Sequence, residues 1–207
     1  QELELAFELS FRLMGLKETK LEQYNIENIN KKYEEIKLSS HIEYNKEQEQ
    51  AILSAFTEPL VIITGGPGTG KTTIIKAILE MYFKLNNDNE ALADYIALLA
   101  PTGKAAKRLK ESTSMPTMTI HKFLGYMGGN IFTASKYNKT MAKLIIIDEA
   151  SMMDLPLASR LVTSMQDDAR LIIVGDVDQL PSVGPGQVLK DLIDSKEIKT
   201  IRLTKIH

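Results

Sequence analysis

Short runs of consecutive apolar residues recur through the middle of the chain, separated by segments whose apolar residues have helical spacing. The runs cover residues 60–63, 95–100, 144–147 and 171–174, and a last strand-like segment covers 198–203. Uninterrupted apolar runs of this length are typical of strands buried on both faces. Segments 72–85, 104–110 and 187–193 favour helices. The pattern therefore predicts an α/β fold with a mostly parallel sheet of five strands flanked by helices.

The first 43 residues have apolar positions at helical spacing and alternating Glu and Lys on the other faces, which predicts two helices. One stripe contains Leu5, Leu9, Leu13 and Leu16, thickened by Phe7, Phe11 and Met14, and the other contains Ile26, Ile29, Tyr33 and Ile36. We interpret residues 1–43 as a helical lead-in that packs on the rest, the tail of a truncated N-terminal domain. Asn45 is a good N-cap for a further helix that leads to residues 44–207, the main domain.

A glycine-rich loop follows the first buried strand and precedes a helix. Residues 65–72 fit the spacing G-x-x-x-x-G-K-S/T of a phosphate-binding P-loop. Glycines let backbone N–H groups point at a polyphosphate, and the helix N-terminus adds its positive dipole end. We expect Lys71 to reach the β- and γ-phosphates of ATP and Thr72 to hold Mg²⁺. The expected nucleotide-binding residues are Gly66, Pro67, Gly68, Thr69, Gly70, Lys71, Thr72 and Thr73.

Two other predicted strands end in polar residues suited to nucleotide chemistry. Asp148 and Glu149 follow the strand at 144–147. Asp148 suits the Mg²⁺ shell, and Glu149 suits a base that orients an attacking water. The loop at 177–186 follows the strand at 171–175, and its Pro and Gly residues fix its shape. Gln179 in this loop would contact the γ-phosphate, provided that its strand lies between the P-loop strand and the Asp148 strand.

Candidate nucleic-acid contacts follow the strand at 95–100, because the carboxyl ends of parallel strands form the ligand-binding edge of such sheets. Thr102, backbone N–H groups and Lys104 suit a phosphate, although a solvated basic helix explains the turn equally well. A short helical or turn segment lies at 119–124, where a lone histidine is usually structural. The sequence at 125–142 predicts a protruding hairpin or a flexible loop that carries lysines. The candidate residues are Pro101, Thr102, Gly103, Lys104, Thr119 and His121.

Composition narrows the classes of function. The chain has 207 residues, 43% of them hydrophobic and 25% charged, which is ordinary for a globular domain. Its formal net charge of −2 means that a nucleic acid would have to meet a local basic patch. The absence of cysteine excludes disulfides and thiol catalysis. No apolar stretch approaches the roughly 20 residues that span a bilayer, so we expect a cytoplasmic protein without a membrane partner.

Five ordered motifs resemble one family closely. The stretches GGPGTGKT, LLAPTGKAAKRL, TIHKFL, IIIDEASM and VGDVDQLPSVGPGQVL are similar to the first RecA-like motor domain of superfamily 1 helicases. The RecD-like group, which includes the RecD subunit of exodeoxyribonuclease V and its stand-alone relatives, is the best match over residues 44–207. The resemblance implies an ATP-dependent 5′-to-3′ DNA helicase of recombination and repair. Its partners would be single-stranded DNA, duplex junctions and, in a nuclease complex, other subunits.

The resemblance also assigns roles residue by residue. Gln48 resembles the glutamine that recognises adenine, although on sequence alone Gln48 and Gln50 favour surface positions. Gln179 resembles the glutamine that couples the γ-phosphate to DNA. The other assignments coincide with the candidates above: Lys71, Thr72, Asp148 and Glu149 at the nucleotide, and residues 101–104, Thr119 and His121 at single-stranded DNA. The hairpin at 125–142 would bear on the strand or duplex junction.

Such helicases use a second RecA-like domain, which supplies arginines to the nucleotide, and the corresponding motif would begin just beyond His207. A charge-neutralising arginine is worth about 10³–10⁵ in rate in P-loop systems. We therefore expect this chain alone to bind ATP–Mg²⁺ weakly, to hydrolyse it poorly and not to translocate. A P-loop kinase and a nucleotide-gated scaffold without turnover are the alternatives. The pattern lacks an arginine-rich lid for the first, and intact Lys71, Asp148 and Glu149 argue against the second.

Overall fold

The computed structural model describes residues 2–19, 24–179, 184 and 186–206, and only the backbone for 14–19. Its helices are α1 (Glu2–Thr19), α2 (Ile26–Ser40), α3 (Lys46–Thr57), α4 (Lys71–Leu85), α5 (Gly103–Thr113), α6 (Ile120–Phe123), α7 (Leu155–Ser164) and α8 (Val188–Asp194), with 3₁₀ turns η2 (Glu90–Tyr95) and η3 (Ala150–Met152). Its strands are β1 (Leu60–Gly65), β2 (Ile96–Ala100), β3 (Met118–Thr119), β4 (Tyr126–Gly128), β5 (Ile131–Phe132), β6 (Leu144–Ile147), β7 (Arg170–Gly175) and β8 (Lys199–Leu203).

The main sheet confirms the predicted α/β fold. In the described residues it has six strands in the order β3-β2-β6-β7-β1-β8, and every neighbouring pair is parallel. The prediction of five strands was one short, because β3 has only two residues and gives no apolar run. Strand β7 lies between β1 and β6, which is the arrangement that the proposed role of the loop after β7 requires.

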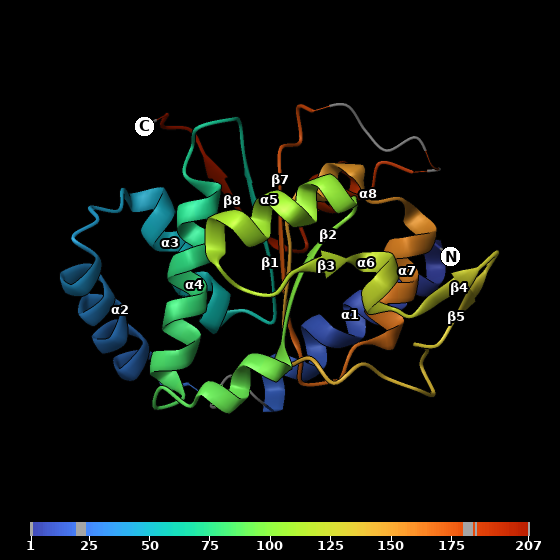
Figure 1. Cartoon of the computed structure of the whole chain (residues 1–207), viewed down its shortest axis with the longest axis horizontal. Coiled ribbons are helices and arrows are strands. Elements are labelled where there is room, and N and C mark those ends of the chain that lie inside the picture. Colours follow the sequence, from blue (N-terminus) through green and yellow to red (C-terminus); the bar gives the residue numbers. More distant parts are fainter. Residues whose placement is uncertain (1, 20–23, 180–183, 185, 207) are drawn as a thin grey trace.

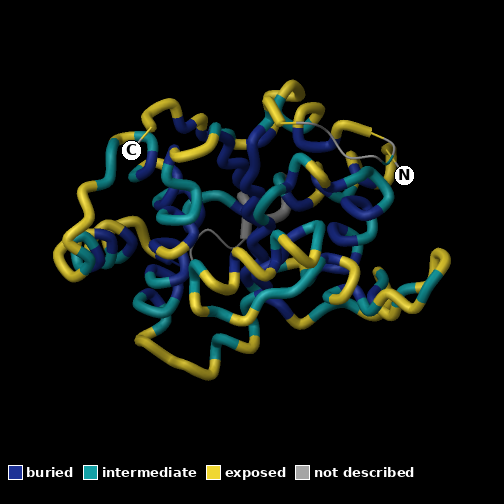
Figure 2. Tube along the Cα trace, turned by 45° about the horizontal axis from the view of Figure 1, so that its top comes forward, coloured by how far each residue is buried: buried dark blue, intermediate teal, exposed yellow. Residues whose placement is uncertain are grey.

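Helices cover both faces of the sheet, so the domain has three layers (Figure 1). Helices α2, α3, α4 and α5 contribute to the buried cluster on one face, and α1, α6, α7 and α8 to the cluster on the other. Alternate residues of β1 take part in each: Val61 and Ile63 face the first cluster, Leu60 and Ile62 the second. Figure 2 shows the central strands buried and the peripheral turns exposed.

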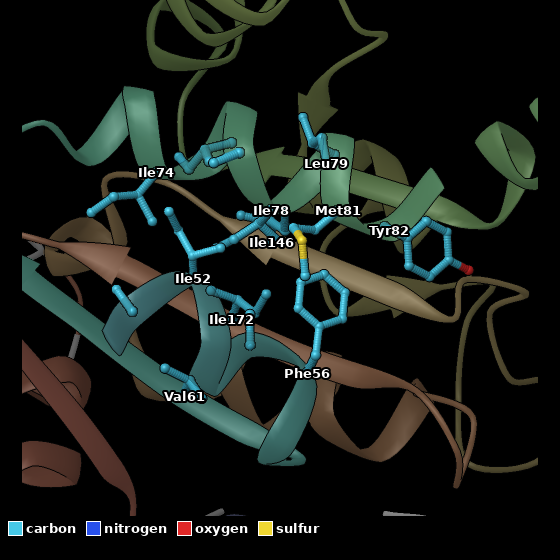
Figure 3. Close-up of a cluster of buried hydrophobic side chains, with 14 of the residues drawn as sticks. Ile52, Phe56, Val61, Ile74, Ile78, Leu79, Met81, Tyr82, Ile146 and Ile172 are labelled. Atoms are coloured by element: carbon cyan, nitrogen blue, oxygen red, sulfur yellow. The ribbon is translucent and has the colours of Figure 1, made fainter. Parts of the chain in front are cut away.

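Isoleucine is the most frequent residue in the first cluster, and several of these isoleucines come from the unbroken apolar runs. In Figure 3, side chains from α3 and α4 lie against the strands; those labelled are Ile52, Phe56, Val61, Ile74, Ile78, Leu79, Met81, Tyr82, Ile146 and Ile172. Burying each of these large side chains contributes about 1.5–3 kcal/mol, which offsets the entropy cost of ordering the chain. This packing fixes the P-loop strand relative to the helix that follows it.

The lead-in helices pack on opposite faces of the sheet. Helix α1 contacts α7, whereas α2 contacts α3 and α4 (Figure 1). Leu5 and Leu9 are buried as expected, but Phe7 and Phe11 are exposed, because they lie on the other side of α1 from the buried leucines. The side chains of Met14 and Leu16 lie outside the described residues. In α2 the predicted Ile29, Tyr33 and Ile36 are buried, whereas Ile26 is exposed.

Short polar side chains cap several helices, and Asn45 was predicted to be one of these caps. Asn45 accepts a hydrogen bond from the N–H of Gln48, and Gln48 Oε1 accepts one from the N–H of Asn45, a complete capping box. The side chains of Thr102 and Asp154 cap α5 and α7 by accepting hydrogen bonds from the N–H groups of Ala105 and Leu157. Residues 125–142 contain the predicted hairpin, in which β4 and β5 pair antiparallel and extend away from the body (Figure 1). Helix α7 and the turn η2 were not predicted.

Candidate nucleotide-binding site

The P-loop forms a closed turn between β1 and α4. Gly68 and Gly70 have φ values of 74° and 87°, in the left-handed region that favours glycine. The hydroxyl of Thr69 donates to the carbonyl oxygen of Gly66 at 2.8 Å and braces the loop from inside. The ammonium of Lys71 donates to the carbonyl oxygens of Gly65 and Gly66 at 2.7 and 2.8 Å. The P-loop therefore holds the positively charged Lys71 ammonium against its own backbone carbonyls, and Lys71 is the first residue of the 15-residue helix α4.

Strand β6 brings two carboxylates to the same edge of the sheet. The N–H of Asp148 continues the strand pairing by donating to Leu99 O at 2.9 Å. Asp148 Oδ1 accepts a hydrogen bond from the N–H of Glu149 at 2.9 Å. Burial raises the pKa of Asp148, and the nearby Glu149 carboxylate raises it further. The hydrogen bond from Glu149 N–H and the positive charge of Lys71 oppose that rise. The Asp148 carboxylate therefore interacts electrostatically with the ammonium of the P-loop lysine.

Glu149 has an unusual backbone conformation. Its φ of 54° lies in the left-handed region, which costs a non-glycine residue on the order of 1 kcal/mol. The turn η3 starts immediately after it. This conformation turns the chain sharply at the end of β6.

The loop after β7 lies at the same edge of the sheet, between the P-loop after β1 and the carboxylates after β6. Asp176 is buried, and its Oδ1 accepts from the N–H of Asp178 at 3.0 Å. The N–H of Gln179 donates to the carbonyl oxygen of Asp176 at 3.2 Å, and Thr64 of β1 accepts from Val177 N–H at 3.3 Å. This turn carries Gln179, whose side chain is exposed. Residues 180–183 and 185 of the predicted loop lie outside the described residues.

Three adjacent parallel strands, β1, β7 and β6, thus carry Lys71, Gln179 and Asp148 just beyond their carboxyl ends. The sequence analysis made the role of Gln179 conditional on its strand lying between the P-loop strand and the Asp148 strand, and the observed strand order satisfies that condition. Asp176 was missed, although a carboxylate directly after a buried strand is the same pattern that identified Asp148.

Gln48 lies on α3, next to the P-loop. It is 4% exposed, and its Nε2 lies 3.4 Å from the carbonyl oxygen of Thr69. The sequence alone favoured a surface position for this glutamine, and that expectation was wrong: the capping box and the contact with the P-loop place it in the interior. Gln50 is exposed. Recognition of adenine by Gln48 stays a prediction.

The candidate nucleic-acid residues gather farther along the same edge. Thr102 follows β2, and Thr119 ends β3, whose partner across the pair is Ala100. Both threonines use their hydroxyls as helix caps, for Ala105 N–H and Lys122 N–H. Lys104 and His121 are exposed.

His121 joins this edge to the hairpin. The centre of its ring lies 5.2 Å from that of Tyr126 and 6.1 Å from that of Phe132, on which it is stacked. The guanidinium of Arg160, on α7, lies over the Phe132 ring at 4.8 Å from its centre. The hairpin and the 119–124 segment therefore form one aromatic cluster.

The donor chemistry fits a magnesium nucleotide. Within the described residues, no group of three or more His, Asp or Glu side chains is arranged to hold a metal ion by itself. Mg²⁺ in nucleotide sites needs only one or two protein oxygens, since water and phosphate oxygens complete its shell. The Thr72 hydroxyl and the Asp148 carboxylate are such hard oxygen donors. None of the helices in the described ranges is long and apolar enough to cross a membrane.

Comparisons with known proteins agree with this geometry. A family model described as "AAA domain" matches residues 48–185. The chain is 37% identical over 169 residues to the RecBCD enzyme subunit RecD of Mycobacterium tuberculosis, covering 74% of this chain and 29% of that protein. It is 38% identical over 163 residues to the ATP-dependent RecD2 DNA helicase of Deinococcus radiodurans, covering 79% of this chain and 21% of that protein. The chain thus spans less than a third of the length of these relatives.

Solved structures share the fold. The Pif1 helicase from Candida albicans matches with a TM-score of 0.57 and 22% identity over 80% of this chain and 40% of that chain. Pif1 from a Bacteroides species in complex with ADP-AlF4 matches with a TM-score of 0.51 and 22% identity, over 80% and 43%. At this level of identity the likeness shows the fold alone.

Proposed function

Because the chain belongs to the AAA-domain family and is similar in sequence to RecD subunits and a RecD2 helicase, we propose that it is the ATP-binding motor domain of a DNA helicase. One observation carries the proposal: the P-loop, the Asp148–Glu149 pair and the Gln179 turn meet at the ends of three adjacent strands. A nucleotide whose triphosphate lies in the P-loop would have its terminal phosphate at this meeting point. ATP hydrolysis needs these groups together at that phosphate.

Each group has a distinct part in the proposed site. The backbone N–H groups of residues 66–73, except that Pro67 has none, and the ammonium of Lys71 bind the phosphate oxygens. Lys71 exchanges its present bonds to the loop carbonyls for bonds to the β- and γ-phosphates. Glu149 orients the attacking water and accepts its proton. Mg²⁺, held by Thr72 and through water by Asp148, would neutralise phosphate charge when bound.

Gln179 gives the site a route to DNA. Its turn is fastened to β1 through Thr64 and to Asp176. As the resemblance implies, Gln179 would couple the state of the γ-phosphate to the DNA held at Thr102 and Thr119. We propose that residues 101–104, Thr119 and His121 hold single-stranded DNA and that the hairpin meets the duplex junction. Movement would be 5′ to 3′, as the RecD-like similarity implies. The longer protein would act in the cytoplasm, alone as a RecD2-like helicase or with other subunits as a RecD-like one.

Binding of a fluorescent nucleotide, MANT-ATP with Mg²⁺, tests the site in the 207-residue chain. Lys71→Ala should weaken binding at least tenfold, because bonds from a charged donor to phosphate are each worth about 1.5–3 kcal/mol. Lys76→Ala is the matched control, since Lys76 is an exposed lysine on the same helix. Equal affinity of the two variants would remove Lys71 from the site. In the longer protein, oligo-dT should stimulate ATP hydrolysis, and Lys71→Ala should abolish that stimulation.

A further inference from the structure

A carboxylate on α3 holds the segment that leaves the last strand of the sheet. Glu47 Oε2 accepts a hydrogen bond from the N–H of Thr204 at 2.7 Å, and Oε1 accepts one from the Thr204 hydroxyl at 2.6 Å. Both oxygens are therefore engaged by one residue that is 157 positions away in the sequence. In Figure 1 the chain leaves β8 beside α3 at the rim of the sheet.

The segment of residues 204–206, held in this way, lies against the P-loop. A Cβ on Gly68 would lie 3.3 Å from Cγ2 of Ile206, so Ile206 covers the outer turn of the loop. A Cβ on Gly65 would lie 3.0 Å from the carbonyl oxygen of Leu203, so the base of the loop is in contact with the same strand end. Ile206 is 78% exposed and keeps its apolar surface toward solvent beside the loop.

Helix α3 contacts the P-loop a second time, through the residue next to Glu47. Gln48 reaches the Thr69 carbonyl oxygen from the inside, while Glu47 holds the 204–206 segment on the outside. Two successive side chains of one helix thus fix the two sides of the loop. A purely structural tie between α3 and β8 would not require the segment to lie over Gly68.

We propose that Glu47 is a positioning residue of the nucleotide site, which holds residues 204–206 against the P-loop as one side of the pocket for an adenosine nucleotide. This inference rests on the proposed function. Its physical basis is preorganisation: a segment that is already held in place contacts the ligand without a further loss of conformational entropy on binding.

The charge of Glu47 strengthens the attachment. The hydroxyl and N–H of Thr204, followed by the N–H and charge of Lys205, lower the pKa of Glu47, which shows that these donors favour its ionised form. Hydrogen bonds to an ionised acceptor are shorter and stronger than those between neutral groups. A glutamine at position 47 would keep one acceptor and lose the charge.

The test measures two quantities on the 207-residue chain: the affinity for MANT-ADP with Mg²⁺, and the hydrogen exchange of the amides of residues 204 and 205. Glu47→Ala should speed this exchange at least tenfold. It should also lower the affinity for MANT-ADP roughly fivefold, as expected if the released segment lies against the P-loop about one-fifth of the time. Glu47→Gln should lie between this variant and the unmodified chain. Glu49→Ala is the matched control, since Glu49 is also an acid in the first turn of α3.

The other partner of the contact supplies a second, milder perturbation. Thr204→Val removes the hydroxyl and should weaken MANT-ADP about twofold, whereas Thr204→Ser keeps it and should restore the affinity of the unmodified chain. The double variant Glu47→Ala/Thr204→Val should bind MANT-ADP no more weakly than Glu47→Ala alone, because Glu47→Ala already removes the hydrogen bond that Thr204→Val deletes. The Val and Ser pair keeps the test decisive if Glu47→Ala does not fold.

Two results would overturn the inference while leaving the nucleotide site in place. One is faster exchange at 204–205 in Glu47→Ala with unchanged MANT-ADP affinity, and the other is an equal loss of affinity in Glu49→Ala. Failure of the unmodified chain to bind MANT-ADP would overturn the proposed function, and this inference with it.

Discussion

Gly65 is the position where the account of the P-loop can be tested most simply by one added methyl group. It is the last residue of β1 and pairs in register with Leu203 of β8. An added Cβ would lie 2.7 Å from Thr69 Oγ1, 2.9 Å from Leu203 Cβ and 3.0 Å from Leu203 O. Two of these neighbours belong to β8, which is hydrogen-bonded to β1, so the strand itself would have to move.

Gly66 is the matched control because it is the next residue in the same loop. A Cβ there would meet no atom within 4 Å, and its φ is not among the positive values. Overpacking of a rigid site costs about 1–3 kcal/mol, whereas glycine to alanine at a compatible site stabilises by about 0.4–1 kcal/mol. We therefore expect Gly65→Ala to be less stable than Gly66→Ala by about 2–3 kcal/mol.

Thermal unfolding without nucleotide measures this difference. In a chain of this size, 1 kcal/mol shifts the midpoint by about 2–4 °C, so the two variants should differ by roughly 4–12 °C. Urea unfolding provides the free energies directly. If Gly65→Ala unfolds at the same temperature as Gly66→Ala, then β8 does not press on the P-loop, and the reasoning about the 204–206 segment loses its base.

Two further predictions concern α7 and the carboxylate of β6. Arg12→Met should lower the free energy of unfolding, measured by urea denaturation, by about 2–3 kcal/mol. The reason is that the buried guanidinium donates hydrogen bonds to the carbonyls of Gln166, Val162 and Met165 at the end of α7. The control Arg108→Met, at an exposed arginine, should change this free energy little. Asp148→Asn should raise the free energy of unfolding at pH 8, because burial raises the pKa of Asp148 and ionisation above that pKa destabilises the folded state. This gain in stability should shrink toward pH 4, where the carboxyl group is increasingly protonated. A gain that does not depend on pH would contradict this cause.

The elements that the sequence could predict are those with a strong local pattern. The apolar runs and the P-loop spacing are local, and they led directly to β1, β6, β7 and the helix after the loop. Asn45 as a cap is likewise a local choice, and the capping box confirms it. Even the strand order could be stated as a condition, because only one arrangement brings the Gln179 loop beside both other strand ends.

Other features depend on contacts between distant residues or on weak local patterns. Strand β3 has two residues and exists because β2 supplies its partner. The bonds from Thr204 to Glu47, and the burial of Gln48 under Thr69, join segments whose proximity no local pattern encodes. Helix α7 is different: its apolar residues at 157, 158, 161 and 162 have helical spacing, so a local signal for this helix is present in the sequence.

The central claim is that Lys71, Asp148 and Gln179 meet at one terminal phosphate. A crystal structure of this chain with Mg²⁺ and a non-hydrolysable ATP analogue tests it directly. The account predicts the γ-phosphate within hydrogen-bonding distance of Lys71 Nζ and the Gln179 side chain, with Mg²⁺ on Thr72 and Asp148 reaching it through water. A nucleotide bound away from the P-loop, or phosphates that Asp148 and Gln179 do not approach, would contradict it.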